Sequence, residues 1–218
     1  MSPASPVQSL ARRWKSLGAP TGVENALVFG PQGADLARAV QTALSPGSLT
    51  LLHPDPPPPR ARFRTDPATL TDLAAVRPGA FDLIVAGGGL EIGGLSQVRS
   101  RLAALAELLT EDGVLAAEIQ TFAAPGPDED FDALLFPHLA RAGELEDGRA
   151  ARAPLTAASW TLLLRSAGLH PAALDGVGAQ RLPQELGLLH SARLAAYDPV
   201  ELSTGALRLV ARKAGGAA

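Results

Sequence analysis

The sequence of 218 residues contains no cysteine, and aromatic residues make up only 4% of it. Without cysteine the chain forms no disulfide and has no thiolate metal ligand or cysteine nucleophile, which favours a reducing compartment. The four histidines, His53, His138, His170 and His190, are scattered and lack the spacing of a motif such as HExxH. We therefore expect no metal site.

Long apolar runs are also absent. No stretch of about 18 apolar residues predicts a transmembrane helix, and the first residues lack the apolar segment of a secretory signal. The net charge of −3 gives no general attraction to nucleic acid or to an anionic membrane. With 46% hydrophobic residues the chain is long enough for one α/β domain. We expect it in the cytoplasm, associated with neither membranes nor nucleic acid.

The stretch 81–120 has the pattern of one βαβ unit. Phe81–Ala86 is a short apolar run typical of a buried strand, and Gly87, Gly88 and Gly89 then allow a sharp turn with room for a ligand. Leucines and a valine recur at helical spacing over 95–109, and Asp112-Gly113 is predicted to end this helix. Three charged residues lie on its other faces: Arg99, Arg101 and Glu107. Val114–Ile119 is the returning strand, expected to be parallel to the first.

This unit resembles the middle of a class I S-adenosylmethionine-dependent methyltransferase. That family has a strand FDLV, a turn, a helix ending LLKPGG and a strand VLV, and this chain has FDLIVAGGGLE, LLTEDG and VLAAE. The later segments SWTLLLRSAGLH and ALRLVARK are similar to its last helix and last strand. The resemblance implies a doubly wound, mostly parallel seven-stranded sheet with an antiparallel final strand. It also implies a single α/β domain over 23–218, preceded by an N-terminal helix and tail over 1–22.

The segment ALVFGPQGADLA resembles the first motif of that family. It predicts a strand over Ala26–Phe29, a turn and then a helix, whose first N–H groups have no helical partner and can bind a ligand. The resemblance implies that Gly30 and Gly33 in the turn contact S-adenosylmethionine. The sequence departs from the motif at Val28, where the family has an acid, and at Gln32, where it has a glycine.

The residues after the next two predicted strands are candidates for contacts with ribose and adenine. The family carries a ribose-binding acid after the second strand, predicted here at Ser48–Leu52, but this chain has His53, with Asp55 two residues on. A carboxylate accepts hydrogen bonds from two hydroxyls and a neutral imidazole from one. Alternatively, Asp55 only shapes a turn. Asp66 matches the acid that contacts the adenine amino group, but it is also suited to capping a helix.

Two residues are candidate bases, and Gly87 beside one of them is expected to border the cofactor. Glu91 lies in the loop that follows Gly87, and His138 has a side chain whose usual pKa lies near neutrality, although a single histidine is more often structural. Methyl transfer depends mainly on positioning the reactants, so it needs few dedicated residues.

The predicted function is S-adenosylmethionine-dependent methyl transfer to a small-molecule or protein acceptor that the sequence does not identify. The alternative is a methyltransferase-like protein without catalysis, which binds cofactor weakly or not at all and acts as a binding or assembly module with a protein partner. Val28, Gln32 and His53 motivate this alternative, because each replaces a residue that the family uses to bind the cofactor.

Overall fold

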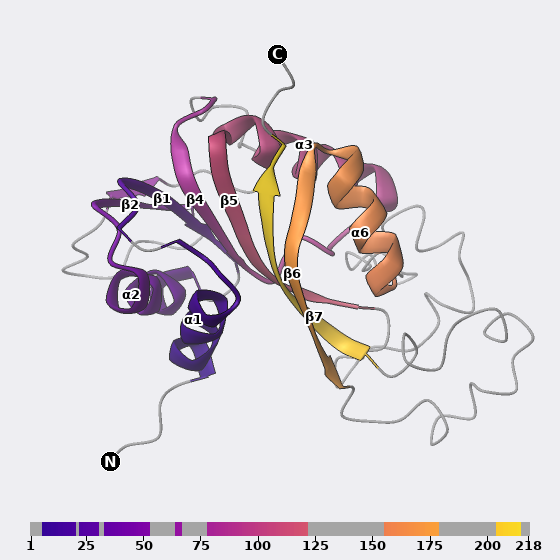
Figure 1. Cartoon of the computed structure of the whole chain (residues 1–218), viewed down its shortest axis with the longest axis horizontal. Helices are drawn as coiled ribbons and strands as arrows, with labels where there is room; N and C mark the ends of the chain where they lie inside the picture. The colour runs from indigo at the N-terminus through magenta and orange to yellow at the C-terminus, as the bar shows by residue number, and fades with distance from the viewer. Residues whose placement is uncertain are drawn as a thin grey trace, which may run out of the picture.

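A twisted sheet with helices on both faces forms the centre of the molecule (Figure 1). The computed structural model describes residues 6–20, 22–30, 33–52, 64–66, 78–121, 155–178 and 204–214. Within these ranges the sheet has seven strands in the order β3-β2-β1-β4-β5-β7-β6. The strands are β1 (Asn25–Phe29), β2 (Ser48–Leu52), β3 (Arg64–Asp66), β4 (Phe81–Gly87), β5 (Leu109–Gln120), β6 (Leu169–Gly178) and β7 (Thr204–Lys213).

The strand directions agree with the fold expected from the sequence. The strands β1 to β5 pair in parallel, and β7 lies antiparallel between β5 and β6. The predicted doubly wound α/β sheet with an antiparallel final strand is therefore confirmed. The chain moves outward from β1 to β2 and β3 on one side, and from β4 to β5 on the other.

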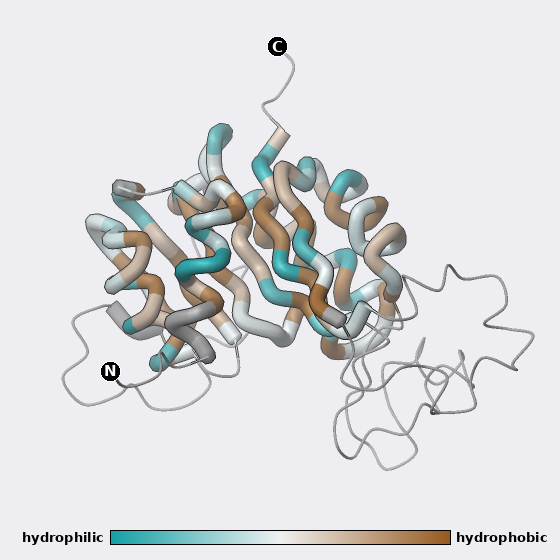
Figure 2. The backbone as a smooth tube through the Cα atoms, turned by 60° about the horizontal axis from the view of Figure 1, so that its bottom comes forward, coloured by the Kyte–Doolittle hydropathy of each residue, from teal (hydrophilic) through white to brown (hydrophobic). Residues whose placement is uncertain are grey.

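Two apolar layers cover the sheet, one on each face. Helices α1 (Pro6–Ser16) and α2 (Gly33–Leu44) pack on one face, and α3 (Leu95–Leu108) and α6 (Ala157–Ser166) pack on the other. Successive residues of β1 alternate between the layers, and all but its first residue are buried, as expected of a central parallel strand. Figure 2 shows hydrophobic residues recurring along the strands. No helix within the described ranges is long and apolar enough to cross a membrane.

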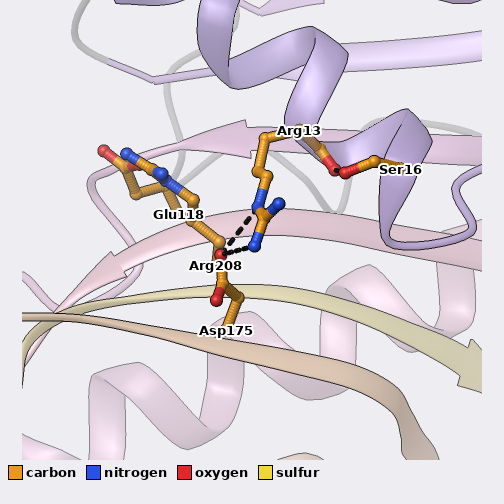
Figure 3. A network of polar contacts seen from close by, with 5 residues as sticks. All are labelled: Arg13, Ser16, Glu118, Asp175 and Arg208. Atoms are coloured by element: carbon orange, nitrogen blue, oxygen red, sulfur yellow. Dashed lines mark hydrogen bonds and ion pairs between the residues drawn. The ribbon is translucent and has the colours of Figure 1, made fainter.

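The first helix, α1, is fixed to the sheet by apolar packing and by an ion pair. The indole of Trp14 is fully buried, and the Nε of Arg13 donates to Asp175 Oδ2 of β6 at 2.7 Å. Beside this pair, Arg208 of β7 donates to Glu118 of β5 at 2.8 Å, so charges of alternating sign cross three neighbouring strands (Figure 3). A helix was expected within residues 1–22, and α1 confirms it.

The end of α3 differs from the sequence prediction. The helix ends at Leu108 and not at Asp112-Gly113, and β5 begins directly at Leu109. Leu109 has extended backbone angles and pairs with Phe81 of β4, while Lys213 Nζ donates to its carbonyl at 2.7 Å. The helix therefore ends where Leu109 pairs with the sheet, although the helical spacing of apolar residues continues to Leu109.

Candidate functional site

The candidate site lies at the carboxyl ends of β1 and β4, where the chain turns to opposite sides of the sheet. Open α/β sheets bind ligands in the crevice outside the carboxyl ends of the strands at such a point. The turn that opens with Gly30 follows β1, and a loop over residues 88–94 follows β4. The fold therefore brings together two of the segments that the sequence predicted to border a cofactor.

Two glycines at this point are packed against protein. Gly30 has a φ of +138°, and a Cβ on it would lie 2.7 Å from the carbonyl oxygen of Gly87. A Cβ on Gly87 would lie 2.6 Å from Leu36 Cδ2 of α2. The side on which a Cβ would stand is thus occupied at both positions, by backbone at Gly30 and by the end of a flexible side chain at Gly87. Packing against backbone alone explains glycine at Gly30, so its presence there is no independent evidence for a ligand.

The turn after β1 leads straight into α2. The N–H of Gly33 donates to the carbonyl oxygen of Gly30 at 3.1 Å, and the helix begins at this residue. The N–H groups of Ala34 and Asp35, in the first turn, have no earlier helical residue to pair with. Backbone donors at a helix N-terminus favour an anionic group such as a carboxylate.

Strand register puts Asp66 at the same edge of the sheet. Asp66 ends β3 and pairs with Leu52, which pairs with Phe29, which in turn pairs with Ala86 of β4. With about 4.8 Å between neighbouring strands, the Asp66 backbone lies roughly 10 Å from that of Phe29. This separation suits a contact with the far end of an extended ligand. His53, Asp55 and His138 lie outside the described residues, and their roles stay predictions.

Glu91 lies in the loop after β4, and its side chain is only 3% exposed. The guanidinium of Arg101 on α3 is close enough for the two charges to interact. Burial lowers the pKa of Arg101, and the carboxylate of Glu91 opposes this shift. The catalytic role of Glu91 stays a prediction. Among the described residues no three acidic or histidine side chains gather as metal ligands.

Arg101 was not among the site residues predicted from the sequence. The helical pattern placed it on a face of α3 away from the apolar residues. Its Nη1 donates to the backbone carbonyls of Gly89, Leu90 and Ile92 in the loop after β4. A signal was present in the sequence. A glycine-rich loop leading into a helix has carbonyls without neighbouring donors, and an arginine in the second turn of that helix can reach back to them.

The structure gives a mixed fit to S-adenosylmethionine. The N-terminus of α2 suits the carboxylate of its methionine part. Strand register puts the backbone of Asp66 at the same edge of the sheet, and its contact with the adenine amino group stays a prediction. Val28, where an acid would pair with the ammonium, is fully buried in the apolar layer under α1 and α2. The backbone donors thus fit the cofactor, and position 28 offers no acid to its ammonium.

No family model matches the sequence, and no curated protein matches it. Solved structures match over nearly the whole chain. The 1,6-didemethyltoxoflavin-N1-methyltransferase of Burkholderia thailandensis, solved with S-adenosylhomocysteine, is 18% identical with a TM-score of 0.57, and the match covers 96% of this chain and 77% of that one. An S-adenosylmethionine-dependent methyltransferase of Mesorhizobium loti is 13% identical with a TM-score of 0.61, over 94% and 99% of the two chains.

The [4+2]-cyclase SpnF is also similar, at 15% identity and a TM-score of 0.60, over 94% of this chain and 80% of its own. This chain has the class I methyltransferase fold. Identities this low carry no chemistry with them, and the cyclase shares the architecture under a different activity. The methyltransferase fold therefore indicates that a ligand is expected at the carboxyl edge of the sheet. The identity of the ligand depends on the residues at that edge.

Proposed function

We propose that this chain binds S-adenosylmethionine at the carboxyl edge of its sheet and transfers the methyl group to an acceptor. The observation that carries the proposal is the alignment of three elements at one edge of a methyltransferase fold. These are the turn from Gly30 to Gly33, the loop after Gly87, and Asp66 in the same row of paired strand residues. Several solved neighbours with this fold are methyltransferases, and one of them was solved with S-adenosylhomocysteine.

When bound, S-adenosylmethionine supplies a methyl group on a positively charged sulfur. The residues of this chain bind and orient it. The N–H groups at the start of α2 hold the carboxylate, Asp66 accepts from the adenine amino group, and His53 or Asp55 accepts from the ribose hydroxyls. Aligning the acceptor with the methyl group supplies much of the rate in such a displacement. His138 is the candidate for taking a proton from the acceptor, and Glu91, the other candidate that the sequence offered, is buried.

A second function is favoured by the burial of Val28. A valine fully enclosed by apolar side chains leaves the ammonium of the cofactor without its carboxylate partner at that position. Glu91, which the sequence offered as a candidate base, is buried beside Arg101. On this alternative the chain keeps the methyltransferase fold without catalysis and acts as a binding or assembly module for a protein partner.

Calorimetric titration of the purified chain with S-adenosylmethionine, and separately with S-adenosylhomocysteine, distinguishes the two functions. The proposal predicts a dissociation constant below roughly 100 µM, which corresponds to about −5.5 kcal/mol. Asp66→Asn should weaken binding at least tenfold, because an amide presents one acceptor oxygen and a donor where the carboxylate presents two acceptors. The matched control is Asp112→Asn, an exposed aspartate near the start of β5, at the end of the strand away from the candidate site.

Each outcome has a direct meaning. Binding to the wild type that is weakened by Asp66→Asn but not by Asp112→Asn supports a cofactor site at this edge, and an acceptor screen follows. Absence of heat and of any thermal shift at millimolar ligand rejects the methyltransferase proposal and favours the module without catalysis. Equal weakening by both variants would show that the ligand site does not lie beside β3.

A further inference from the structure

The loop between β4 and α3 is built mainly from backbone, and much of it is buried. Gly88, Gly89 and Gly93 all have positive φ, at +84°, +88° and +92°. Gly89, Gly93 and Gly94 are buried together with Leu90 and Glu91. Buried carbonyl groups need hydrogen-bond donors, and glycines bring no side chains that could supply them. The shape of this loop must therefore be held by groups from other elements.

The first two turns of α3 supply these groups. Arg101 Nη1 donates to the carbonyl of Gly89 at 3.4 Å, to that of Leu90 at 3.2 Å, and to that of Ile92. One turn earlier, Gln97 Oε1 accepts from the N–H of Gly94 at 2.8 Å. Nη1 carries two N–H groups, so at least one of them is shared between two carbonyls, and the planar guanidinium holds both groups in a fixed direction.

The base of the loop is fixed independently of α3. The N–H of Gly88 donates to the carbonyl of Glu118 on β5 at 3.0 Å, and Gly87 is packed against Leu36. Residues 89–92 have Arg101 as the donor to three of their four carbonyls. Loss of Arg101 should therefore loosen this segment and leave β4 in place.

Glu91 has the features of a buried counter-charge. Its side chain is 3% exposed, and the carbonyls of its two neighbours, Leu90 and Ile92, both accept from Arg101 Nη1, so the guanidinium lies beside it. A carboxylate removed from water is strongly unfavourable unless an opposite charge accompanies it. The two residues therefore depend on each other, and removing Arg101 alone would leave a negative charge in the interior.

We propose that Arg101 is a positioning residue, which holds the loop over 89–92 in the shape that borders the ligand site, and that Glu91 is its buried counter-charge and not a catalytic base. The role in ligand binding rests on the function proposed above. The role in holding the loop does not, since it follows from contacts within the protein. The two parts can thus fail separately.

Amide hydrogen exchange on the full chain tests the loop-holding role. Arg101→Met should raise exchange rates over residues 89–92 at least tenfold relative to the strands of the sheet, because three carbonyls lose their donor. Arg101→Lys should give an intermediate rate, since an ammonium keeps the charge on a more flexible side chain. The matched control is Arg99→Met, an exposed arginine on the same helix, which should leave this loop unchanged. Unchanged exchange in both Arg101 variants would overturn the proposal.

A double-mutant cycle tests the counter-charge. If Glu91 balances Arg101, then Glu91→Gln combined with Arg101→Met should be more stable in urea unfolding than Arg101→Met alone, because no charge is left buried. If Glu91 instead faces the ligand as an independent base, the two substitutions should destabilise additively. Additive effects would refute the counter-charge role. Arg101→Gln with Glu91→Gln serves as a second cycle if Arg101→Met does not fold, because glutamine also removes the positive charge.

Ligand binding then separates this inference from the proposed function. If the wild type binds S-adenosylhomocysteine, Arg101→Met should weaken binding at least tenfold and Arg101→Lys should restore part of the loss, while Arg99→Met has no effect. Unaltered affinity in an Arg101→Met protein with a loosened loop would refute the positioning role. If the wild type does not bind this ligand, the proposed function fails, and the role of Arg101 in the loop is decided by exchange and by the cycle alone.

Discussion

Replacing Gly30 with alanine should destabilise the protein strongly, for two reasons that the structure separates. The first is conformational. A φ of +138° lies outside the small left-handed region that other residues can reach, so an L side chain is strained there. The second is steric. The new Cβ would lie 2.7 Å from the carbonyl oxygen and 3.1 Å from the carbonyl carbon of Gly87, and neither backbone atom belongs to a flexible side chain that could move away.

The expected cost is the sum of these two effects. Backbone strain at a position reserved for glycine costs about 1–3 kcal/mol, and overpacking by one methyl group costs a further ~1–3 kcal/mol. Gly30→Ala should therefore lower the free energy of unfolding by about 2–6 kcal/mol. Gly79→Ala is the matched control. Gly79 has a φ of +62° and open space where its Cβ would stand, so only strain of about 1–2 kcal/mol is expected.

Urea unfolding followed by circular dichroism measures both variants against the wild type. With a slope of roughly 2 kcal/mol per molar urea, Gly30→Ala should move the midpoint by about 1–3 M, and Gly79→Ala by less than about 1 M. Equal shifts in the two variants would refute the close contact between β1 and β4. The result also bears on function, because reduced ligand binding by Gly30→Ala can arise from lost packing and must not be read as a lost cofactor contact.

Two further substitutions test the packing on the α1 and α2 side and the fixing of β1. The indole of Trp14 is fully buried, and its Nε1 has no hydrogen-bond partner among the described residues. In urea unfolding, Trp14→Phe should therefore cost about 1–2 kcal/mol and Trp14→Ala about 3–5 kcal/mol. Equal costs would show that ring packing is not what Trp14 contributes. Asp82 Oδ2 accepts from the N–H groups of Glu24 and Asn25 at 3.2 and 3.0 Å, so Asp82→Ala should cost about 1–3 kcal/mol and Asp82→Asn less, because an amide oxygen still accepts. Both Asp82 variants should bind ligand normally when folded, and a loss of binding by Asp82→Asn would contradict its place at the far end of the sheet.

The sequence predicted most of the fold because its central elements are buried on both faces. The apolar runs of β1 and β4 each gave bounds within one residue of those found, since a buried strand of this kind leaves few alternatives. The end of α3 was not predictable in the same way. Its apolar period runs on to Leu109, and only the pairing of that residue with Phe81 shows that the helix has already ended.

The site was less predictable than the fold, for a physical reason. A charged residue on an amphipathic helix usually faces solvent, so the pattern around Arg101 indicated exposure. Its half-buried position depends on carbonyl groups of a loop whose glycines give no side-chain signal. Similarly, the glycines at Gly30 and Gly87 indicated room for a ligand, and nothing in the local pattern indicated that distant segments pack where a Cβ would stand at both positions. Local patterns do not include such contacts between distant segments.

Val28 contributes to the stability of the fold through apolar packing. Val28 pairs with Leu51 and Val85 on the neighbouring strands and lies in the same apolar layer as Leu36. A valine there adds apolar burial, whereas a carboxylate would need hydrogen-bond donors to offset its removal from water. Stability and ligand affinity thus place opposite demands on this position. The methyltransferase fold can persist when the carboxylate that would bind the ligand is replaced by valine. Similarity of fold is therefore weak evidence for binding, and direct titration with the ligand is the decisive test.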